Sequence, residues 1–161
     1  MLRSRITPCL LISDGALVKT QNFDSPKYVG DPINAVKIFN EKGADELIVL
    51  DISATKNSLS PNFNLIEKLA AECRMPLCYG GGVNSAEYAS KLVDMGVEKV
   101  AVSSAAIKNQ KLINEMVSAV GRQSVVVVLD FIKKKKFFSS NEYELCSHNA
   151  KKFYKEDPFI F

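Results

Sequence analysis

The chain has 161 residues, of which 47% are hydrophobic, and a formal net charge of +3 from 21 basic and 18 acidic residues. That length allows one substantial core, and the low glycine and proline content excludes a disordered chain. The nearly balanced charge gives no electrostatic argument for binding nucleic acid or a membrane. We therefore expect one globular domain over residues 1–161.

The hydropathy pattern and the cysteines restrict the class of protein further. No apolar stretch reaches the roughly 18 to 20 residues that cross a bilayer, and the first apolar segment is too short for a secretory signal, so we expect a cytoplasmic protein. The cysteines at positions 9, 73, 78 and 146 are irregularly spaced and there is one histidine. This pattern favours free thiols and predicts no metal site.

Strand-like and helix-like segments alternate along the chain. The strand-like runs are apolar without polar alternation, which is typical of strands buried on both faces of a parallel sheet. They cover residues 5–12, 47–52, 75–79, 99–104 and 124–131. Helical spacing is found over 31–45, 64–73, 85–96 and 109–121. The first helix is expected to begin after an Asp31 cap with Pro32 at its first position and to end at Gly43.

A repeated segment selects among parallel α/β folds. "GADELIVLD" at 43–51 and "GVEKVAVSS" at 96–104 carry a helix into the next strand with the same pattern. This similarity indicates duplicated βα units and favours a (β/α) barrel over an open doubly wound sheet. In such barrels the chemistry lies at the carboxyl ends of the strands.

Three glycines follow the third apolar run. Gly80, Gly81 and Gly82 precede a helix, where backbone N–H groups without neighbouring Cβ atoms can bind a phosphate. Ser103 and Ser104, at the end of the next run, could donate to the same oxygens. The alternative is that the glycines form a sterically permissive turn.

Charged residues stand at both ends of the predicted strands. Asp51 and Asp130 close apolar runs, where a carboxylate is suited to proton transfer. The alternative is that they cap a helix or pair with a lysine such as Lys19. A second set stands at the strand starts, where charge usually serves stability but could also gate an axial passage. This set consists of Arg5, Glu46 and Lys99.

The motifs together resemble a known family over nearly the whole chain. "RITPCLLISDGALVK", "MPLCYGGGVNSAEYASKLVDMGVEKVAVSSAAIKNQKLI" and "SVVVVLDFIKKK" are similar to the cyclase subunit of imidazole glycerol phosphate synthase, a ribulose-phosphate-binding (β/α)8 barrel of histidine biosynthesis. The resemblance implies a partner glutamine amidotransferase that supplies ammonia through the barrel axis. It also implies cleavage and cyclisation of a ribulosyl aminoimidazole nucleotide without metal or organic cofactor.

The resemblance assigns roles to matching residues. Asp130 matches one of two catalytic aspartates, and Lys19 and Asp51 match further active-site positions. The residues that match one of two phosphate sites are Gly80, Gly81, Gly82, Ser103 and Ser104. Those that match three of the four charged residues at the ammonia entrance are Arg5, Glu46 and Lys99.

Two departures from the family pattern change the expectations. The family has its other catalytic aspartate in "PCLD", and this chain reads "PCLL" with Leu11 in its place. Loss of one acid/base group costs about 10² to 10⁴ in rate. Keeping the entrance while losing the acid resembles paralogues found beside surface-polysaccharide genes, which are thought to help a glutamine amidotransferase deliver ammonia to a sugar-modifying enzyme.

The second departure is length. A (β/α)8 barrel needs about 250 residues, whereas this chain ends after its fifth predicted strand at "EDPFIF". We expect a truncated or frameshifted product, an incomplete barrel of about five parallel strands. Its open sheet edge invites self-association, and an inactive fragment is the third functional alternative.

Overall fold

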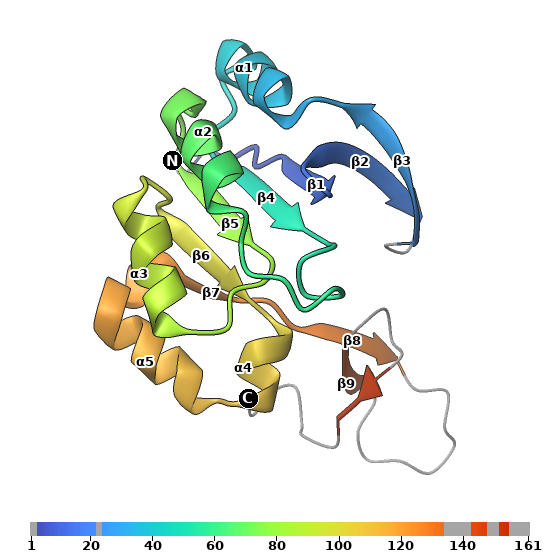
Figure 1. Cartoon of the computed structure of the whole chain (residues 1–161), viewed down its shortest axis with the longest axis vertical. Coiled ribbons are helices and arrows are strands. Elements are labelled where there is room, and N and C mark those ends of the chain that lie inside the picture. Colours follow the sequence, from blue (N-terminus) through green and yellow to red (C-terminus); the bar gives the residue numbers. More distant parts are fainter. Residues whose placement is uncertain (1–2, 22–23, 134–142, 148–151, 155–161) are drawn as a thin grey trace.

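The computed structural model describes residues 3–21, 24–133, 143–147 and 152–154. Within these residues, five neighbouring parallel strands belong to a seven-stranded open sheet and extend to one of its edges, which confirms the expected incomplete barrel architecture (Figure 1). The parallel strands are β1 (Cys9–Ser13), β4 (Leu47–Asp51), β5 (Leu77–Gly80), β6 (Lys99–Val102) and β7 (Val125–Val127). The ending "EDPFIF" lies outside the described residues.

An antiparallel hairpin that the sequence pattern did not indicate extends the sheet beside β1. It consists of β2 (Ala16–Gln21) and β3 (Asp24–Gly30), so the strand order is β3-β2-β1-β4-β5-β6-β7. β1 is joined to β2 by a tight turn at Asp14 and Gly15, both with positive φ. β1 itself begins only at Cys9, later than the predicted 5–12 segment.

Helices connect the parallel strands and cover one face of the sheet. They are α1 (Pro32–Lys42), α2 (Phe63–Glu72), α3 (Ala86–Asp94), the short α4 (Ser104–Lys108) and α5 (Lys111–Val120). The Asp31 side chain caps α1 by accepting from the Asn34 amide, and Gly43 ends it in the left-handed conformation, as the sequence predicts. α1 contacts α2 and α3 contacts α5, so the helices form a layer outside the strands (Figure 1). Among the described residues, no helix combines the length and apolar character needed to traverse a bilayer.

The core lies between this helical layer and the sheet. Alternate strand residues such as Val49, Tyr79 and Val100 are fully buried there against Leu69 of α2 and Met116 of α5. Because side chains alternate along a strand, the residues between them face the other side of the sheet. The cross-strand register places Leu11, Leu50, Gly80, Ala101 and Val126 in one row on that other face.

The predicted strand over residues 124–131 is wrong as a single element. A 3-10 turn (Arg122–Ser124) leads into β7, which ends at Val127, and β8 (Asp130–Lys133) begins a separate antiparallel sheet. That sheet has the order β10-β9-β8, with β9 (Tyr143–Ser147) in the middle and β10 (Lys152–Phe153) at its edge. The chain leaves the parallel sheet here because β8 pairs with β9, which lies later in the sequence.

Candidate functional site

A cavity of about 650 Å³ lies at the carboxyl ends of β4, β5 and β6. We call it the strand-end cavity. Its walls include the predicted site residues Asp51, Gly80, Gly81, Gly82, Ser103, Ser104 and Asp130. The structure therefore brings together both expected carboxylates, the glycines and the two serines, which lie up to 79 positions apart in the sequence.

One oxygen of Asp51 is occupied by the loop that follows β4. Its Oδ1 accepts hydrogen bonds from the Ser53 amide at 2.9 Å, the Ser53 hydroxyl at 2.7 Å and the Ala54 amide at 3.0 Å. Ser53 Oγ in turn accepts from the Asp14 amide at 3.2 Å, which ties this loop to the β1–β2 turn. Asp51 thus caps a turn rather than a helix, and it has no ion pair with Lys19 among the described residues.

Gly80, Gly81 and Gly82, which we call the glycine turn, are required by packing. A Cβ on Gly80 would lie 2.9 Å from both the Ala101 Cβ and a Leu50 methyl. Gly81 has φ +120° and passes against the Asp51 backbone, so a side chain there would overlap the Asp51 carbonyl oxygen. The turn is therefore sterically demanding in itself, and this packing explains the three glycines without a ligand.

Gly82 packs closely against the loop over residues 52–61. A Cβ at Gly82 would lie 2.7 Å from the Leu59 carbonyl oxygen and 3.1 Å from the Pro61 nitrogen. The Gly82 amide donates to Thr55 Oγ1 at 3.2 Å. The loop is thus both a wall of the cavity and a clamp on the glycine turn.

Ser103 and Ser104 stand where β6 passes into α4. Ser103 precedes α4 without capping it through its side chain, and neither serine hydroxyl is hydrogen-bonded within the described residues. Asp130, the first residue of β8, is exposed and reaches the cavity from the small sheet. The cavity therefore carries free hydroxyl donors near a carboxylate that solvent can reach.

Two predicted active-site positions lie outside the strand-end cavity as described. Leu11 is half-buried on β1, opposite Leu50 and Val18, where its side chain contributes only apolar surface. Lys19 is exposed on β2, opposite Lys27 in the hairpin. Neither belongs to the residues that line the cavity, so their assigned roles remain predictions.

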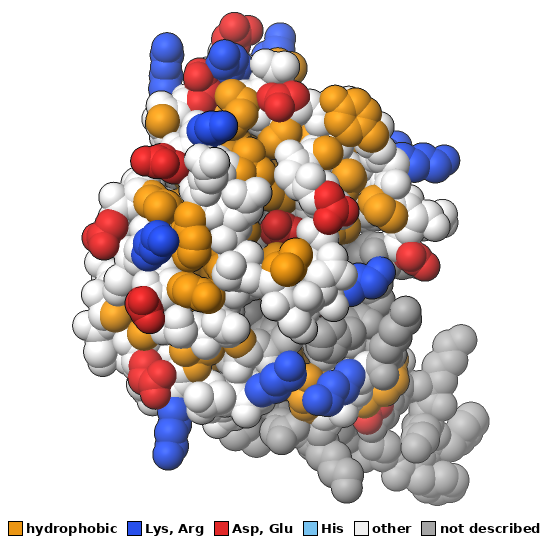
Figure 2. Space-filling model, viewed as in Figure 1, with side chains coloured by type: hydrophobic (Ala, Val, Ile, Leu, Met, Phe, Trp, Pro, Cys, Tyr) orange, Lys and Arg blue, Asp and Glu red, His pale blue; other side chains and the backbone are white. Residues whose placement is uncertain are grey.

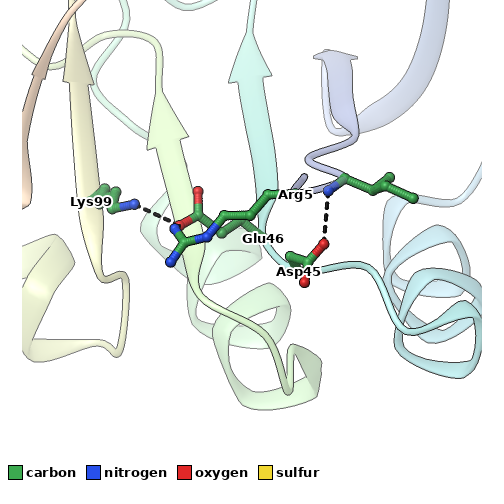
Figure 3. Close-up of polar contacts among 5 residues, drawn as sticks. Arg5, Asp45, Glu46 and Lys99 are labelled. Atoms are coloured by element: carbon green, nitrogen blue, oxygen red, sulfur yellow. Dashed lines mark hydrogen bonds and ion pairs between the residues drawn. The ribbon is translucent and has the colours of Figure 1, made fainter. Parts of the chain in front are cut away.

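The charged residues at the strand starts form one cluster at the opposite end of the sheet. We call Arg5, Glu46 and Lys99 the rim cluster. Glu46 Oε1 accepts from Arg5 Nη1 and from Lys99 Nζ, each at 2.9 Å (Figure 3). The hydrogen bond from Lys99, aided by both positive charges, holds the pKa of Glu46 below its usual range.

Backbone pairing positions Arg5 in this cluster. The Ile6 amide donates to the Asp45 carboxylate at 2.7 Å (Figure 3). The Asp45 amide in turn donates to the Ile6 carbonyl at 3.0 Å. This pair holds the segment before β1 against the segment before β4. Glu46 and Lys99 lie on either side of the start of β5, because β5 separates their strands in the sheet.

Charge elsewhere on the molecule is mixed. On the face shown in Figure 2, lysine and arginine side chains are interspersed with aspartate and glutamate side chains.

Burial raises the pKa of the Cys78 thiol to about 11, and Cys78 lies opposite Lys99 on the sheet. All four cysteines are free, and in the described parts of the chain no group of three or more His, Cys, Asp or Glu side chains is placed to hold a metal ion.

Sequence reasoning missed several lining residues. Thr55 and Lys56 come from the 52–61 loop, Lys108 and Asn109 from the end of α4, and Asp24 from the hairpin. The loop had a usable signal, because "DISATKNSLSPN" is a long polar connection directly after a strand, and such loops commonly carry binding residues. The hairpin and α4 had no comparable periodicity.

A helix-covered parallel sheet with its cavity at the carboxyl ends of the strands defines a protein of the TIM-barrel class. A family model described as "Histidine biosynthesis protein" matches residues 5–156, and the chain belongs to this family.

Individual relatives agree with this assignment. The chain is 56% identical over 152 residues to a protein of Leptospira borgpetersenii and 54% identical over 152 residues to one of Leptospira interrogans, each named "Putative imidazole glycerol phosphate synthase subunit HisF". Each match covers 94% of this chain and 59% of the relative. Over 130 residues it is 42% identical to the imidazole glycerol phosphate synthase subunit HisF of Bacillus cereus, covering 81% of this chain and 52% of that protein. The chain thus spans little more than half the length of these relatives.

Proposed function

We propose that this chain supplies the strand-end cavity and the rim cluster of a cyclase-type subunit of imidazole glycerol phosphate synthase. The carrying observation is that Asp51, Asp130, the glycine turn and two unbonded serine hydroxyls line one cavity. The rim cluster lies at the other end of the same strands. These two ends suit a subunit that receives ammonia at one end and uses it at the other.

The cavity suits a phosphorylated substrate. Ser103 and Ser104 offer hydroxyl donors, and Lys56 and Lys108 bring positive charge to the same walls. Hydrogen bonds to an ionised group are stronger than those between neutral partners, so such donors would anchor a phosphate firmly. The glycine turn forms part of the same walls.

Asp130 is the carboxylate best placed for proton transfer. It is exposed in the cavity, whereas one oxygen of Asp51 already accepts three hydrogen bonds. We assign the acid/base role to Asp130 and an orienting role to Asp51, which fixes the loop that forms one wall. No metal or organic cofactor is part of this proposal.

The rim cluster suits an entrance for ammonia and a contact with a glutamine amidotransferase. Glu46 holds both cations through the same oxygen, so the cluster is closed by two ion pairs that a docking subunit could rearrange. Relatives named as subunits of imidazole glycerol phosphate synthase support a partner of this kind.

Leu11 favours a second candidate function. With an apolar side chain on β1 in place of a carboxylate, the site has one acid/base group fewer than the family pattern predicts. The second candidate is a non-cyclising partner that conducts ammonia from a glutamine amidotransferase to another enzyme. It keeps the rim cluster and needs no chemistry at Leu11.

The test measures formation of imidazole glycerol phosphate from the ribulosyl aminoimidazole nucleotide with ammonium salt. Variants Asp130→Asn and Leu11→Asp are compared with the parent chain. The cyclase proposal expects turnover that Asp130→Asn abolishes and Leu11→Asp raises, by as much as about 10²-fold.

The same preparations are then mixed with a glutamine amidotransferase of this pathway. Stimulated glutamine hydrolysis without cyclisation, in both the parent chain and Leu11→Asp, would establish the conduit function instead. Absence of both turnover and stimulation would refute both candidates. Lys37→Ala, on the outer face of α1, serves as a control that should change neither readout.

A further inference from the structure

The Gly82 amide, which the glycine turn would offer to a phosphate, is already engaged. It donates to Thr55 Oγ1 at 3.2 Å, across 27 positions of sequence. A phosphate that approaches the glycine turn therefore meets the Thr55 hydroxyl beside this amide.

Thr55 is held in a firmly bonded loop. The loop begins at Asp51, whose Oδ1 accepts from Ser53 and Ala54. It continues with the Leu59 amide donating to the Ala54 carbonyl at 2.8 Å and the Ser58 amide to the Thr55 carbonyl at 3.3 Å. These bonds, and the contact of the loop backbone with Gly82, fix Thr55 at the wall of the strand-end cavity.

The hydrogen bonds that a hydroxyl can donate and accept determine where the proton of the Thr55 hydroxyl points. A threonine hydroxyl has one proton and accepts through its lone pairs. Since Oγ1 of Thr55 accepts from Gly82, its own proton points away from that amide. Within the described residues this proton has no acceptor, and Thr55 lines the cavity. Donation from the amide also polarises the hydroxyl and makes it a stronger donor.

The surrounding charge suits an anion at this point. Lys56 follows Thr55 directly, and Lys108 lines the cavity from α4. Neither lysine forms an ion pair within the described residues. A phosphate beside Thr55 would thus bring the negative charge that these side chains lack.

We infer that Thr55 is a phosphate-binding residue whose hydroxyl, oriented by the Gly82 amide, donates to the bound phosphate. This inference rests on the proposed function, because it deepens the phosphate site of the same cavity. Affinity for phosphate is then shared between the loop after β4 and the loop after β5, and the glycine turn acts partly by orienting Thr55.

The test compares Thr55→Val, which keeps the shape and removes the hydroxyl, with Thr55→Ser, which keeps the hydroxyl. Dissociation constants are measured by isothermal titration calorimetry for inorganic phosphate and for ribose 5-phosphate. We expect Thr55→Val to weaken both by about 10- to 100-fold, the usual range for a hydrogen bond to a charged group. Thr55→Ser should stay within about threefold of the parent chain.

Thr20→Val, the same change on β2 outside the cavity, is the matched control and should bind like the parent chain. Unchanged affinity in Thr55→Val would overturn the inference, since it would mean that the freed Gly82 amide serves the phosphate equally well. Failure of the parent chain to bind either ligand would instead refute the proposed phosphate site itself.

A measurement on the unmutated chain keeps the inference testable if Thr55→Val does not fold. The amide proton of Gly82 is followed by NMR during a titration with inorganic phosphate. Retention of its hydrogen-bonded shift while the Thr55 resonances move supports the inference. Transfer of the Gly82 amide to the phosphate, with Thr55 unaffected, would contradict it.

Discussion

Replacing Gly82 by alanine should destabilise the fold by more than its backbone conformation alone requires. Gly82 has φ +71°, and an added Cβ would lie 2.7 Å from the Leu59 carbonyl oxygen. Gly43, the residue that ends α1, has nearly the same conformation at φ +67°, but no atom lies within 4 Å of its added Cβ. The pair therefore separates backbone strain from steric overlap.

The magnitudes follow from these two environments. Left-handed backbone costs a residue with a side chain about 1 to 2 kcal/mol, and this applies at both positions. Overlap in a packed region adds about 1 to 3 kcal/mol, and this applies only at Gly82. We expect Gly43→Ala to lose about 1 to 2 kcal/mol of unfolding free energy and Gly82→Ala about 2 to 5 kcal/mol.

Urea denaturation followed by far-ultraviolet circular dichroism measures both losses on a common scale. The chain has no tryptophan, so the helical signal is the better probe. Equal slopes of free energy against urea would show that the two variants unfold from comparable native states. Losses that agree within about 0.5 kcal/mol would refute the argument, because the loop over Gly82 would then yield without cost.

Four further predictions concern the rim cluster and two buried groups. In double-mutant cycles on the unfolding free energy, the coupling of Glu46 to half-buried Lys99 should be about 1.5 to 3 kcal/mol, and its coupling to the exposed Arg5 about 0.2 to 1 kcal/mol. Equal coupling energies would contradict the assigned geometry. The pKa of Glu46 is lower in the folded chain than in the unfolded chain, where it is about 4.3. The stability that the Glu46 carboxylate contributes is therefore complete above the unfolded pKa and disappears as the pH falls through the folded pKa. Glu46→Gln should accordingly lose less unfolding free energy than the parent chain between pH 5 and pH 2. The Tyr79 hydroxyl is buried without a hydrogen-bond partner in the described residues, so Tyr79→Phe should leave the unfolding free energy unchanged or raise it by about 1 to 3 kcal/mol, and a clear loss in urea denaturation would be unexpected. Iodoacetamide at pH 8 should modify the exposed Cys9 in the folded chain. Cys78 is 6% exposed and has a pKa of about 11, so it should react only after unfolding. Peptide mass spectrometry that finds both cysteines modified together would argue against the burial of Cys78.

The parallel strands and main helices could be predicted because each has a strong local pattern. The apolar run over 47–52 and the capped segment around Asp31 and Gly43 specify their structures within a few residues. The β2–β3 hairpin carries no such pattern. Its second strand is almost fully exposed and contains Pro26, so its pairing with β2 rests on backbone hydrogen bonds rather than on burial.

The candidate site could be predicted only where it coincides with strand ends. Asp51, the glycine turn and the two serines were identifiable because parallel strands deliver their carboxyl ends to one edge. Thr55 and Lys108 reach the same cavity through a loop and a five-residue helix, whose paths depend on tertiary contacts. The steric requirement for glycine at position 82 could not be predicted either, since Leu59 and Pro61, which contact it, lie more than 20 positions away in the sequence.

Because the 124–131 segment is divided between two sheets, Asp130 and Asp51 belong to different sheets. Only Val128 and Leu129 separate the last strand of the parallel sheet from Asp130, which pairs with Cys146 in the smaller sheet. Asp51 lies in the larger sheet, so the two carboxylates belong to different hydrogen-bonded sheets, joined through Leu129 and through Val128, whose amide still donates to the Val102 carbonyl at 2.9 Å. The spacing of the two carboxylates is thus set by how the small sheet rests against the large one, and substitutions at that junction should tune the chemistry without touching either acid.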